Sequence, residues 1–593
     1  MSRQPHPALI NHWVTVPTDP EAVRSLASAL NWPPAAASIL VSRGITGVEE
    51  ARAWIDPQRR HLLDPMRLPD MARAADRLWD AVANRERITV FGDYDVDGIS
   101  STALLCRLLR TLDADVRPFL PHRLDEGYGL SVEAFERCRE ETRPDLVVTV
   151  DCGTGSVAAV EAAQAVGIDV IITDHHESSG PVAPALAVVN PKLGNHEEDK
   201  LLAGVGVAFK LGHALLKTAH QRQSEPVAGE GGADPTPQLV AARKLLNQLL
   251  GLVALGTVAD IVPLTGENRL VVRHGLDELN LNPWPWVSAM RQVAGIKDSI
   301  DTYEVGYLIG PRLNAAGRLG DAERSLALLL TDDSDEAARI ARVLDEENRK
   351  RQDTEKDMVK TILDRRDPVF DPVTTHAVVE YGEGWHPGVA GIVASRLVAR
   401  YHRPAIVLAV DPTTGIAKGS CRSIPGLNMV ALLNTCSAHL TKHGGHQAAA
   451  GLELPAANLE AFSSAFSAAV AEVWSDDLSH PSQRIDAWLS LADCNEDLLH
   501  ALDAMRPFGM GCPTPVFAVH GVEFAGSPRE VGQGHLKCTF RQGSAMADGI
   551  GFGMFDREPP APPFDIAFTL KWNHWGGRSK PDLHLADFRP GEA

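Results

Sequence analysis

Short continuous runs of apolar residues alternate with amphipathic stretches between residues 85 and 265. Runs of four or five residues, such as 88–91, 146–150 and 170–173, are typical of strands that are buried on both faces of a parallel sheet. The longer stretches between them have the apolar spacing of helices. This part of the chain is therefore predicted to be an α/β domain with helices on both faces of the sheet.

The pattern changes several times along the rest of the chain. Short amphipathic helices come first, a charged helical stretch follows the α/β region, an α/β pattern then restarts, and short strands between Gly and Pro turns come last. The predicted segments are 1–80 for a helical lead-in, 81–333 for the parallel-sheet catalytic domain, 334–366 for a connecting helix, 367–475 for a second, smaller α/β domain, and 481–593 for a small β-barrel.

Residues 334–366 carry apolar side chains at helical spacing, among them Ile340, Leu344 and Met358. A single helix of this length would extend about 50 Å at 1.5 Å per residue, which suits a rigid connector. Two shorter helices broken near Gln352 are the alternative. The polar stretch 221–238, rich in Gly and Pro, is interpreted as a surface insertion.

Composition limits the protein class. The chain has 593 residues, is 44% hydrophobic and 23% charged, and should form about three globular domains. Its eight cysteines form no Cys-x-x-Cys pair, which fits a reducing cytoplasm, and we expect no membrane span because no run of 18 apolar residues occurs. The net charge of −20 argues against nucleic acid, but it does not report local patches or bound metal ions.

Acidic and imidazole side chains follow the predicted strands. Asp93, Asp95 and Asp97 alternate after the first run. Further stations are Asp151 after the second run, Asp174-His175-His176 after the third, and Asp260 after a helical stretch. Ligands bind at the carboxyl ends of parallel strands, so we expect all four stations to meet at one edge of the sheet. Carboxylates packed this closely need a counter-charge, and oxygen ligands favour Mg²⁺ or Mn²⁺. The alternative for one such motif alone is a solvated acidic turn.

Several motifs resemble a known group of enzymes. The ordered set Gly92–Gly98, Asp151–Gly153, Asp174–His176 and Gly256–Asp260 resembles the DHH phosphoesterase superfamily. The downstream motifs Gly310–Arg318, Gly384–Ile392 and Gly444–Gly451 are similar to its RecJ family of single-strand-specific exonucleases. The resemblance runs from about residue 40 to the end of the chain. One departure lies in Gly509–Pro513, where the family pattern leads us to expect an Asn.

The resemblance implies a fold and an activity. The fold would be a DHH catalytic domain, a long helix, a DHH-associated domain and a C-terminal OB-fold, in agreement with the segments above. The activity would be stepwise 5′–3′ hydrolysis of single-stranded DNA to 5′-mononucleotides, with two Mn²⁺ or Mg²⁺ ions, in DNA repair and recombination.

The resemblance also implies the roles of the residues at the metal centre. Asp93 and Asp95 would hold one metal, and Asp97, His175 and Asp260 the other, with Asp151 bridging both. His176 could contact the scissile phosphate or donate a proton to the leaving oxygen, while Asp174 would orient an imidazole. The further candidates at the reacting phosphate are Arg312, Asn314 and Arg318, for which a structural role at a helix end is the alternative.

Candidate substrate contacts lie outside the metal centre. Their chemistry suits phosphate and unpaired bases, because arginine forks bind phosphate oxygens and aromatic rings stack on bases. The resemblance implies Arg123, Tyr128, Ser420 and Arg422 for a 5′-phosphate pocket, for which solvated loop arginines are the alternative. Further candidates are Gly444, Gly445 and His446 for a nucleotide near the reaction centre, and Trp572, Trp575 and Arg578 in the barrel. One or both tryptophans could instead belong to the core, and the glycines could simply make a tight turn.

The resemblance implies partners as well. Single-stranded DNA would be the substrate, with a single-strand-binding protein and a RecQ-type helicase as partners of a monomeric, nucleoid-associated enzyme of the bacterial cytoplasm. One alternative is a DHH phosphoesterase for short oligonucleotides or cyclic dinucleotides, which would lack the barrel. The other is a non-catalytic DNA-binding replication factor, which would lack the metal carboxylates that are all present here.

Overall fold

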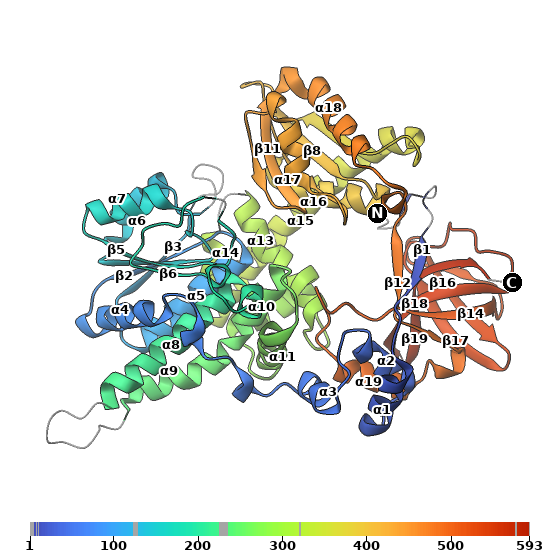
Figure 1. The fold of residues 1–593 in the computed structure, drawn as a ribbon, viewed down its shortest axis with the longest axis horizontal. Coiled ribbons are helices and arrows are strands. Elements are labelled where there is room, and N and C mark those ends of the chain that lie inside the picture. Colours follow the sequence, from blue (N-terminus) through green and yellow to red (C-terminus); the bar gives the residue numbers. More distant parts are fainter. Residues whose placement is uncertain are drawn as a thin grey trace. The chain divides into compact units, whose positions relative to one another are not determined.

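The computed structural model describes residues 5–6, 9, 11–121, 129–178, 180–224, 235–319, 322–575 and 578–591. Figure 1 shows the order of the elements along the chain. The chain forms two compact units. One comprises residues 53–349 with 506–513 and is called the catalytic unit here because it contains the predicted catalytic domain, and the other comprises residues 1–52, 350–505 and 514–593. The predicted boundary at residue 80 falls inside a helix, α4 (Met71–Asn84), which is amphipathic and packs on the catalytic unit.

A five-stranded parallel sheet forms the centre of the catalytic unit. Its strands are β2 (Ile88–Gly92), β3 (Val116–Phe119), β4 (Leu146–Val150), β5 (Asp169–Thr173) and β6 (Ala187–Val189), in the spatial order β3-β2-β4-β5-β6. The chain order reverses between β2 and β4, which is the point where sheets of this kind bind ligands. The predicted parallel sheet is thus present, and its three-residue edge strand β6 was not predicted.

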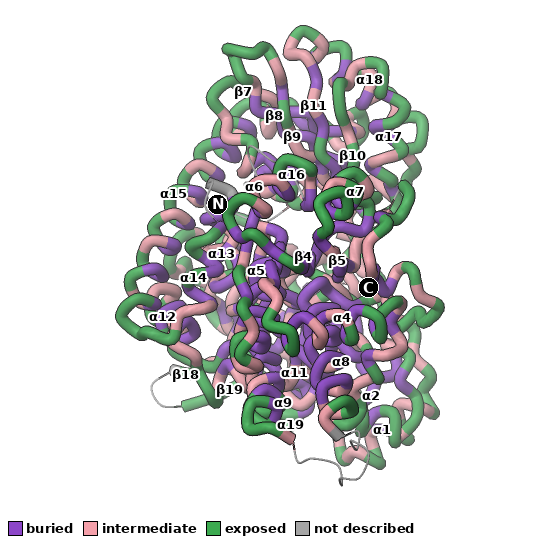
Figure 2. The backbone as a smooth tube through the Cα atoms, turned by 90° about the vertical axis from the view of Figure 1, so that its left-hand side faces the viewer, coloured by how far each residue is buried: buried purple, intermediate pink, exposed green. Residues whose placement is uncertain are grey.

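Helices make up most of the rest of this unit. They are α5 (Val96–Thr111), α6 (Val132–Thr142), α7 (Val157–Ala165), α8 (Gly204–Ser224), α9 (Pro237–Gln248), α10 (Leu250–Ala259), α11 (Gly266–Leu281), α12 (Pro285–Ala294), the π-helical segment η5 (Glu304–Ile309), α13 (Gly310–Leu319) and α14 (Glu323–Leu330). The core lies along β2, β4 and α5, where almost every residue is buried, as the purple tube in Figure 2 shows. Residues 237–259 have the length and hydropathy of a membrane span, but 61% of that window is buried in the core.

A single 33-residue helix, α15 (Ser334–Arg366), connects the two units and covers the residues of the predicted connecting helix. Its apolar side chains at Ile340, Leu344, Met358 and Ile362 are buried. The helix continues through Gln352, so the alternative of two shorter helices is wrong.

In the described residues, the second unit contains two larger sheets, the two-stranded pair β1–β12 and several helices. The first is β10-β11-β9-β8-β7, in which only β7 and β8 are parallel, and the second is a seven-stranded sheet that β14 and β16 close into a ring. The strands are β1 (His12–Thr15), β7 (Val378–Glu383), β8 (Ala405–Asp411), β9 (Ile416–Arg422), β10 (Lys442–Gly445), β11 (Ala449–Pro455), β12 (Ser482–Ile485), β13 (Ala487–Leu489), β14 (Phe517–Phe524), β15 (Arg529–Val531), β16 (His535–Gln542), β17 (Ala545–Gly551), β18 (Phe564–Trp575) and β19 (Arg578–Pro590). The helices are α1 (Pro20–Leu30), α2 (Pro34–Val41), α3 (Val48–Ile55), α16 (Pro387–Tyr401), α17 (Met429–Thr435), α18 (Leu459–Glu472) and α19 (Glu496–Ala504). The lead-in is therefore not wholly helical, because β1 pairs with β12.

Arg269 of α11 ties three distant segments of the catalytic unit together. Its buried guanidinium donates hydrogen bonds to the carbonyl oxygens of Trp54 (3.0 Å), Arg506 (3.1 Å) and Pro507 (2.9 Å). It also lies 3.4 Å from the centroid of the Trp54 ring. A buried charge needs such a full set of acceptors, so the side chain fixes segment 506–513 on this unit.

Replacing Arg269 with Met should leave these carbonyl groups without their donor. We expect Arg269→Met to lower the free energy of unfolding by about 2–4 kcal/mol, as other losses of buried hydrogen-bonded charges do. Urea unfolding followed by circular dichroism would measure this. The control is Arg52→Met, because Arg52 is exposed and makes only a helical ion pair with Glu49. Equal stability of the two variants would contradict this role for Arg269.

Candidate metal centre

The turn from β2 into α5 carries three aspartates in a fixed geometry. Asp95 caps α5, because its Oδ1 accepts hydrogen bonds from the N–H groups of Asp97 (2.9 Å) and Gly98 (3.2 Å). The buried carboxylate of Asp97 accepts hydrogen bonds from the N–H groups of Gly204 (2.7 Å) and Val205 (2.9 Å) at the start of α8. The helix terminus therefore supplies partial positive charge to Asp97. Our sequence analysis missed this contact between Asp97 and the start of α8. The only feature of the sequence that could have indicated it is the spacing of Gly204 and Gly206.

Asp151 follows β4 and adopts an unusual backbone conformation. Its φ of +63° lies in the left-handed region, which is strained for a residue with a Cβ atom. Its backbone N–H donates to the carbonyl oxygen of Thr173 (2.9 Å), which holds the strained residue at the sheet edge. A Cβ atom at Gly204 would lie 2.4 Å from Asp151 Oδ1, so this close approach requires glycine. Strain of this kind is typical of functional sites.

The motif after β5 presents two histidines with different environments. His175 Nε2 lies 3.2 Å from Asp151 Oδ1, 3.8 Å from Asp97 Oδ2 and 3.6 Å from Asp260 Oδ2. His176 Nδ1 lies 2.8 Å from Asp174 Oδ1, an oxygen that also accepts hydrogen bonds from the N–H groups of His175 and His176. Asp174 thus orients His176, whereas His175 faces the three other carboxylates.

Asp260 reaches the centre from a different kind of element than we predicted. It is the C-terminal cap of helix α10, not the end of a strand. The next residue, Ile261, has a φ of +61°, which turns the chain away directly after the carboxylate. The prediction of four strand-end stations was therefore wrong for this residue, although its carboxylate does join the other three stations.

The converging side chains fit divalent metal ions. Three sets have ligand atoms that all lie within 4.8 Å of one another, and they are Asp93 with Asp95 and Asp151, Asp97 with His175 and Asp260, and Asp151 with His175 and His176. Asp151 and His175 each belong to two sets. Among the residues that the structure describes, the buried Nε2 of His175 has no hydrogen-bond partner, as expected of a ligand atom. Carboxylate oxygens with imidazole suit Mn²⁺ or Mg²⁺.

Burial and crowding shift the pKa values of the aspartates upward. Burial, together with the charge of Asp95, raises the pKa of Asp97 to about 7. Burial, with the charge of Asp97, raises the pKa of Asp260 to about 8. The pKa of Asp151 is also well above its usual value, because the residue is buried among the other aspartates. Neighbouring positive charge is what would return these carboxylates to their ionised forms.

The two histidines are shifted in opposite directions. Burial, with the charge of His176, lowers the pKa of His175 to about 3, so its imidazole is neutral and able to bind a metal. Burial alone would lower the pKa of His176, but its hydrogen bond to Asp174 raises it to about 9. The first histidine therefore has the protonation state of a ligand, and the second that of a proton donor.

Residues of α13 support the acidic turn. Asn314 Oδ1 accepts a hydrogen bond from the N–H of Val96 (3.1 Å), and a Cβ atom at Gly317 would lie 2.8 Å from the carbonyl oxygen of Tyr94. Arg312 Nε donates to Asp345 Oδ1 of α15 at 2.9 Å. For Arg312 and Asn314 these bonds favour the structural alternative over direct contact with the reacting phosphate. The side chain of Arg318 lies outside the described part of the structure.

The candidate substrate residues of the second unit lie side by side in one sheet. Ser420 of β9 is in register with Gly451 of β11, which is in register with Gly444 of β10. The guanidinium of Arg422 donates to Ser420 Oγ at 2.9 Å. A cavity of about 340 Å³, lined by Lys418, Gly419, Lys442, Gly444 and Gly451 among others, lies over this face. Gly445 and His446 follow at the exposed end of β10.

The barrel residues have separate environments. Trp572 is half-buried, and its Nε1 donates to Asp503 Oδ2 at 2.7 Å, so this ring fixes α19 on the barrel. Arg578 is exposed and pairs with Trp575 across the end of the β18–β19 hairpin. The side chain of Trp575, and all of Arg123 and Tyr128, lie outside the described residues.

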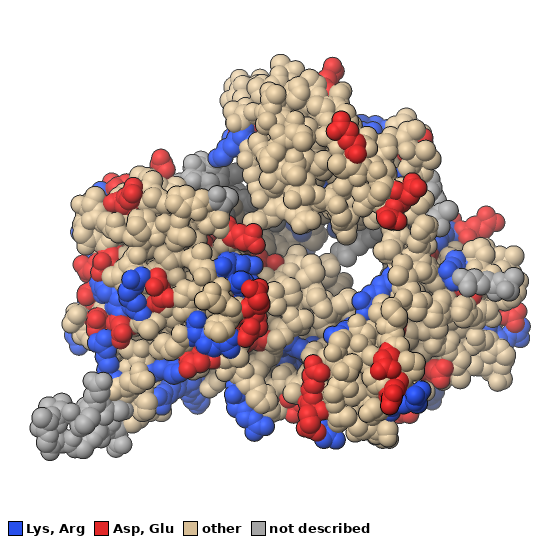
Figure 3. All heavy atoms as spheres, viewed as in Figure 1, with Lys and Arg blue, Asp and Glu red and all other residues tan. Residues whose placement is uncertain are grey.

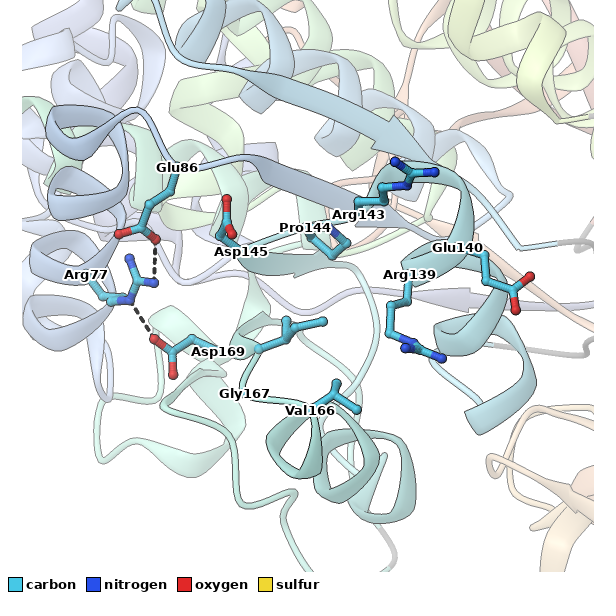
Figure 4. Close-up of a pocket in the computed structure, with 11 residues that line it drawn as sticks. Arg77, Glu86, Arg139, Glu140, Arg143, Pro144, Asp145, Val166, Gly167 and Asp169 are labelled. Atoms are coloured by element: carbon cyan, nitrogen blue, oxygen red, sulfur yellow. Dashed lines mark hydrogen bonds and ion pairs between the residues drawn. The ribbon is translucent and has the colours of Figure 1, made fainter.

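A larger cavity lies at the opposite edge of the parallel sheet. It has a volume of about 860 Å³, and its walls include Glu86, Asp145 and Asp169, which precede or begin β2, β4 and β5. Arg77 bridges Glu86 (2.6 Å) and Asp169 (2.7 Å) in this cavity, as the dashed lines in Figure 4 show. The cavity therefore borders the amino ends of the strands, whereas the metal ligands follow their carboxyl ends.

The distribution of surface charge does not indicate where a substrate binds. The chain has 77 acidic and 57 basic residues, and several of the acids are the buried metal-centre residues described above. In the view of Figure 3, red and blue side chains are interspersed over the visible surface. The net charge of −20 is therefore compatible with an anionic substrate that binds locally.

Comparisons with known proteins agree with this geometry. The chain matches the models for the DHH family, N-terminal domain (residues 87–257), the DHHA1 domain (374–472) and the RecJ OB domain (485–587). It is 35% identical over 584 residues to the single-stranded-DNA-specific exonuclease RecJ of Bacillus subtilis strain 168, covering 97% of this chain and 70% of that protein. The corresponding RecJ of Escherichia coli K12 is 35% identical over 536 residues, covering 88% and 89%. The crystal structure of Thermus thermophilus RecJ in complex with Mn²⁺ has a TM-score of 0.81 at 32% identity, covering 98% of this chain and 80% of that chain.

Metal binding should stabilise the protein because it relieves the repulsion among these aspartates. We expect Mg²⁺ or Mn²⁺ to raise the Tm relative to protein in chelator, and the increase to grow between about pH 6.5 and 8.5. The rise in Tm grows with pH because the pKa values of Asp97 and Asp260 are raised. At the lower pH, protons occupy these ligands and the metal must displace them. Differential scanning fluorimetry would measure the shift.

The matched control for this experiment is a pair of variants at the two ends of β4. Asp151→Asn removes a carboxylate from the centre, and Asp145→Asn removes an exposed one before the same strand. The metal-dependent increase in Tm should be lost in the first variant and kept in the second. An increase of the same size in both variants would exclude Asp151 from the ligand set.

Proposed function

The chain belongs to the RecJ family of single-stranded-DNA-specific exonucleases, and from this membership we propose how its residues hydrolyse unpaired DNA. The enzyme is a metal-dependent phosphodiesterase that removes 5′-mononucleotides in the 5′–3′ direction, in DNA repair and recombination. The observation that carries the proposal is the convergence of five aspartates and two histidines from four segments on the carboxyl edge of one sheet. Such a cluster suits two-metal phosphoryl chemistry.

We propose the following ligand set. Asp93 and Asp95 would hold one metal, Asp97, His175 and Asp260 would hold the other, and Asp151 would be shared by both. The two divalent ions, Mn²⁺ or Mg²⁺, would activate the attacking water and offset charge on the scissile phosphate. Support comes from the shared position of Asp151 in two ligand sets and from the neutral imidazole of His175. The strained backbone of Asp151 holds its carboxylate in place before the substrate arrives.

His176 is our candidate for the general acid. Attack of water on the phosphorus breaks the bond to the 3′-oxygen of the released nucleotide, and that oxygen must gain a proton as it leaves. His176 is protonated at neutral pH because of its bond to Asp174, and it lies beside Asp151 at 3.8 Å. Asp174 serves to orient this imidazole and to keep its proton on the ring.

Recognition of the chain end is assigned to a separate group of residues. We propose that Ser420 and Arg422, with Arg123 and Tyr128, bind the 5′-phosphate of the substrate. Arg422 is partly removed from water, which lowers its pKa and favours an anionic partner. The glycines at 444 and 445 would let a nucleotide approach the backbone closely, next to His446. Arg318 could contact the reacting phosphate, whereas Arg312 and Asn314 act through their structural bonds.

The barrel and the protein partners complete the proposal. Trp575 and Arg578, at the end of the β18–β19 hairpin, would contact unpaired bases and backbone, while Trp572 holds the barrel to α19. An exonuclease that needs unpaired DNA depends on proteins that separate and protect the strands. We therefore propose a RecQ-type helicase and a single-strand-binding protein as partners of a monomer that is cytoplasmic and associated with the nucleoid.

The ligand assignment is tested by changing Asp151. We expect Asp151→Asn to lower the rate of 5′-mononucleotide release from single-stranded DNA by about 1,000-fold or more, because both metals lose a shared ligand. Binding of the single strand should change less than about threefold. Digestion of 5′-phosphorylated, 3′-labelled oligonucleotides measures the rate, and fluorescence anisotropy measures the affinity.

Asp145→Asn is the control for this experiment as well, since it carries the same substitution at the other end of β4. It should retain wild-type turnover. If Asp151→Asn retained turnover too, the assigned ligand set would be wrong, and this conclusion would hold for any substrate that the protein cleaves.

End recognition is tested by the preference for a phosphorylated end. We expect Arg422→Gln and Arg123→Ala each to reduce the ratio of kcat/KM for 5′-phosphate over 5′-hydroxyl ends about tenfold, since each removes a charged phosphate contact. Comparison of the two ends on one oligonucleotide sequence provides the internal control. An unchanged ratio in either variant would remove that arginine from the pocket.

A further inference from the structure

Two exposed tyrosines lie within or directly before the π-helical segment η5, and the mechanism above does not use them. The chain has only six tyrosines, and Tyr303 and Tyr307 are a pair with ring centroids 5.0 Å apart and an angle of 31° between the ring planes. Their exposed fractions are 52% and 53%, which is high for aromatic side chains next to a buried site. A π-helical segment, η5, carries the second ring and begins directly after the first. Such segments are frequently found at functional sites.

The tyrosine pair is coupled to the metal centre through the backbone of the catalytic unit. A Cβ atom at Gly306 would lie 3.8 Å from Val258, and one at Gly310 would lie 3.8 Å from Ala259. The π-helical segment therefore packs against the end of α10, whose cap is the metal-centre residue Asp260. The spacing between the rings and the metal centre is thus fixed by packed elements of one compact unit.

Two more apolar residues, on segments that neighbour this part of the unit, are exposed. Ile261, which follows Asp260, has an exposed fraction of 64%, and Met510 has one of 53%. The N–H of Leu264 donates to the carbonyl oxygen of Met510 (2.8 Å), and Thr302 Oγ1 donates to that of Phe508 (2.6 Å). The segment around Met510 thus lies between the chain after Asp260 and the chain before Tyr303. We call Ile261, Tyr303, Tyr307 and Met510 the aromatic rim.

We propose that the aromatic rim is a stacking platform for the unpaired bases next to the scissile phosphate. The inference rests on the proposed function. An apolar rim that adjoins a phosphodiester-cleaving centre meets the one apolar part of the substrate, the faces of its bases. In a duplex these faces are covered by neighbouring base pairs. The rim therefore also contributes to the preference for single strands, independently of any electrostatic contact with the backbone.

The experiment combines ring variants with abasic substrates. The variants of the full chain are the Tyr303→Ala/Tyr307→Ala double variant, the corresponding double Phe variant and the corresponding double Leu variant. Leu281→Ala is the control, because Leu281 is a 77% exposed apolar residue of the same unit, at the C-terminal end of α11. The substrates are a 5′-phosphorylated oligonucleotide and versions of it with one abasic nucleotide at each of the first few positions. kcat and KM are measured for each combination.

If the rings stack on a base, loss of the rings and loss of that base should have overlapping effects on KM. The double Ala and double Leu variants should raise KM about tenfold with kcat within about twofold of the wild type, and the double Phe variant and Leu281→Ala should match the wild type. An abasic nucleotide at the stacked position should raise the wild-type KM by a similar factor and have no further effect on the Ala variant. Because the Leu variant keeps apolar bulk, it separates loss of stacking from loss of folding.

Two results would overturn the platform. One is equal sensitivity of wild type and Ala variant to abasic nucleotides at every position. The other is a double Phe variant as impaired as the double Ala variant, which would assign the effect to the hydroxyl groups. Failure of the proposed function would look different, since wild-type protein would then release no nucleotide from any single strand.

Discussion

Electrostatic repulsion among buried aspartates is the constraint on which the rest of this structure depends. Asp93, Asp97 and Asp151 are almost completely buried, and Asp260 is largely so, yet their carboxylates face one another. Without a counter-charge such groups retain protons near neutral pH, as the raised pKa values of Asp97 and Asp260 indicate. The fold holds together a cluster that is stable and ionised only with bound cations, so affinity for metal follows directly from the packing of the catalytic unit.

The fold supports this cluster with bonds that do not depend on metal. The N-terminus of α8 donates to Asp97, Asp95 caps α5, and Asn314 accepts from the backbone of the acidic turn. Each bond orients a carboxylate or its backbone before any ligand binds, which reduces reorganisation during the reaction. Arg269 has the corresponding role at longer range, because it fixes the segment that carries Met510 on the catalytic unit.

In the function proposed above, the residues for chemistry and those for end recognition belong to different units of the chain. The metal ligands, the candidate general acid and the aromatic rim belong to the catalytic unit, whereas Ser420, Arg422 and the glycine-lined cavity belong to the other. The division also explains why composition is a poor guide here. In the proposed function, a few arginines and aromatic rings carry recognition, and a net charge summed over the whole chain does not report such local groups.

The sequence by itself determined the elements and most of the chemistry. The apolar runs 88–91, 146–150 and 170–173 predicted β2, β4 and β5, because burial on both faces leaves an unbroken local signal. The strand-end rule then brought Asp93, Asp151 and His175 together. Tertiary structure alone decided that Asp260 arrives from a helix end, that Gly204 makes room for Asp151, and that Trp572 and Arg312 bond to Asp503 and Asp345. These contacts join residues dozens of positions apart. Periodicity reports only neighbours along the chain, whereas desolvation and hydrogen bonding depend on which surfaces pack together.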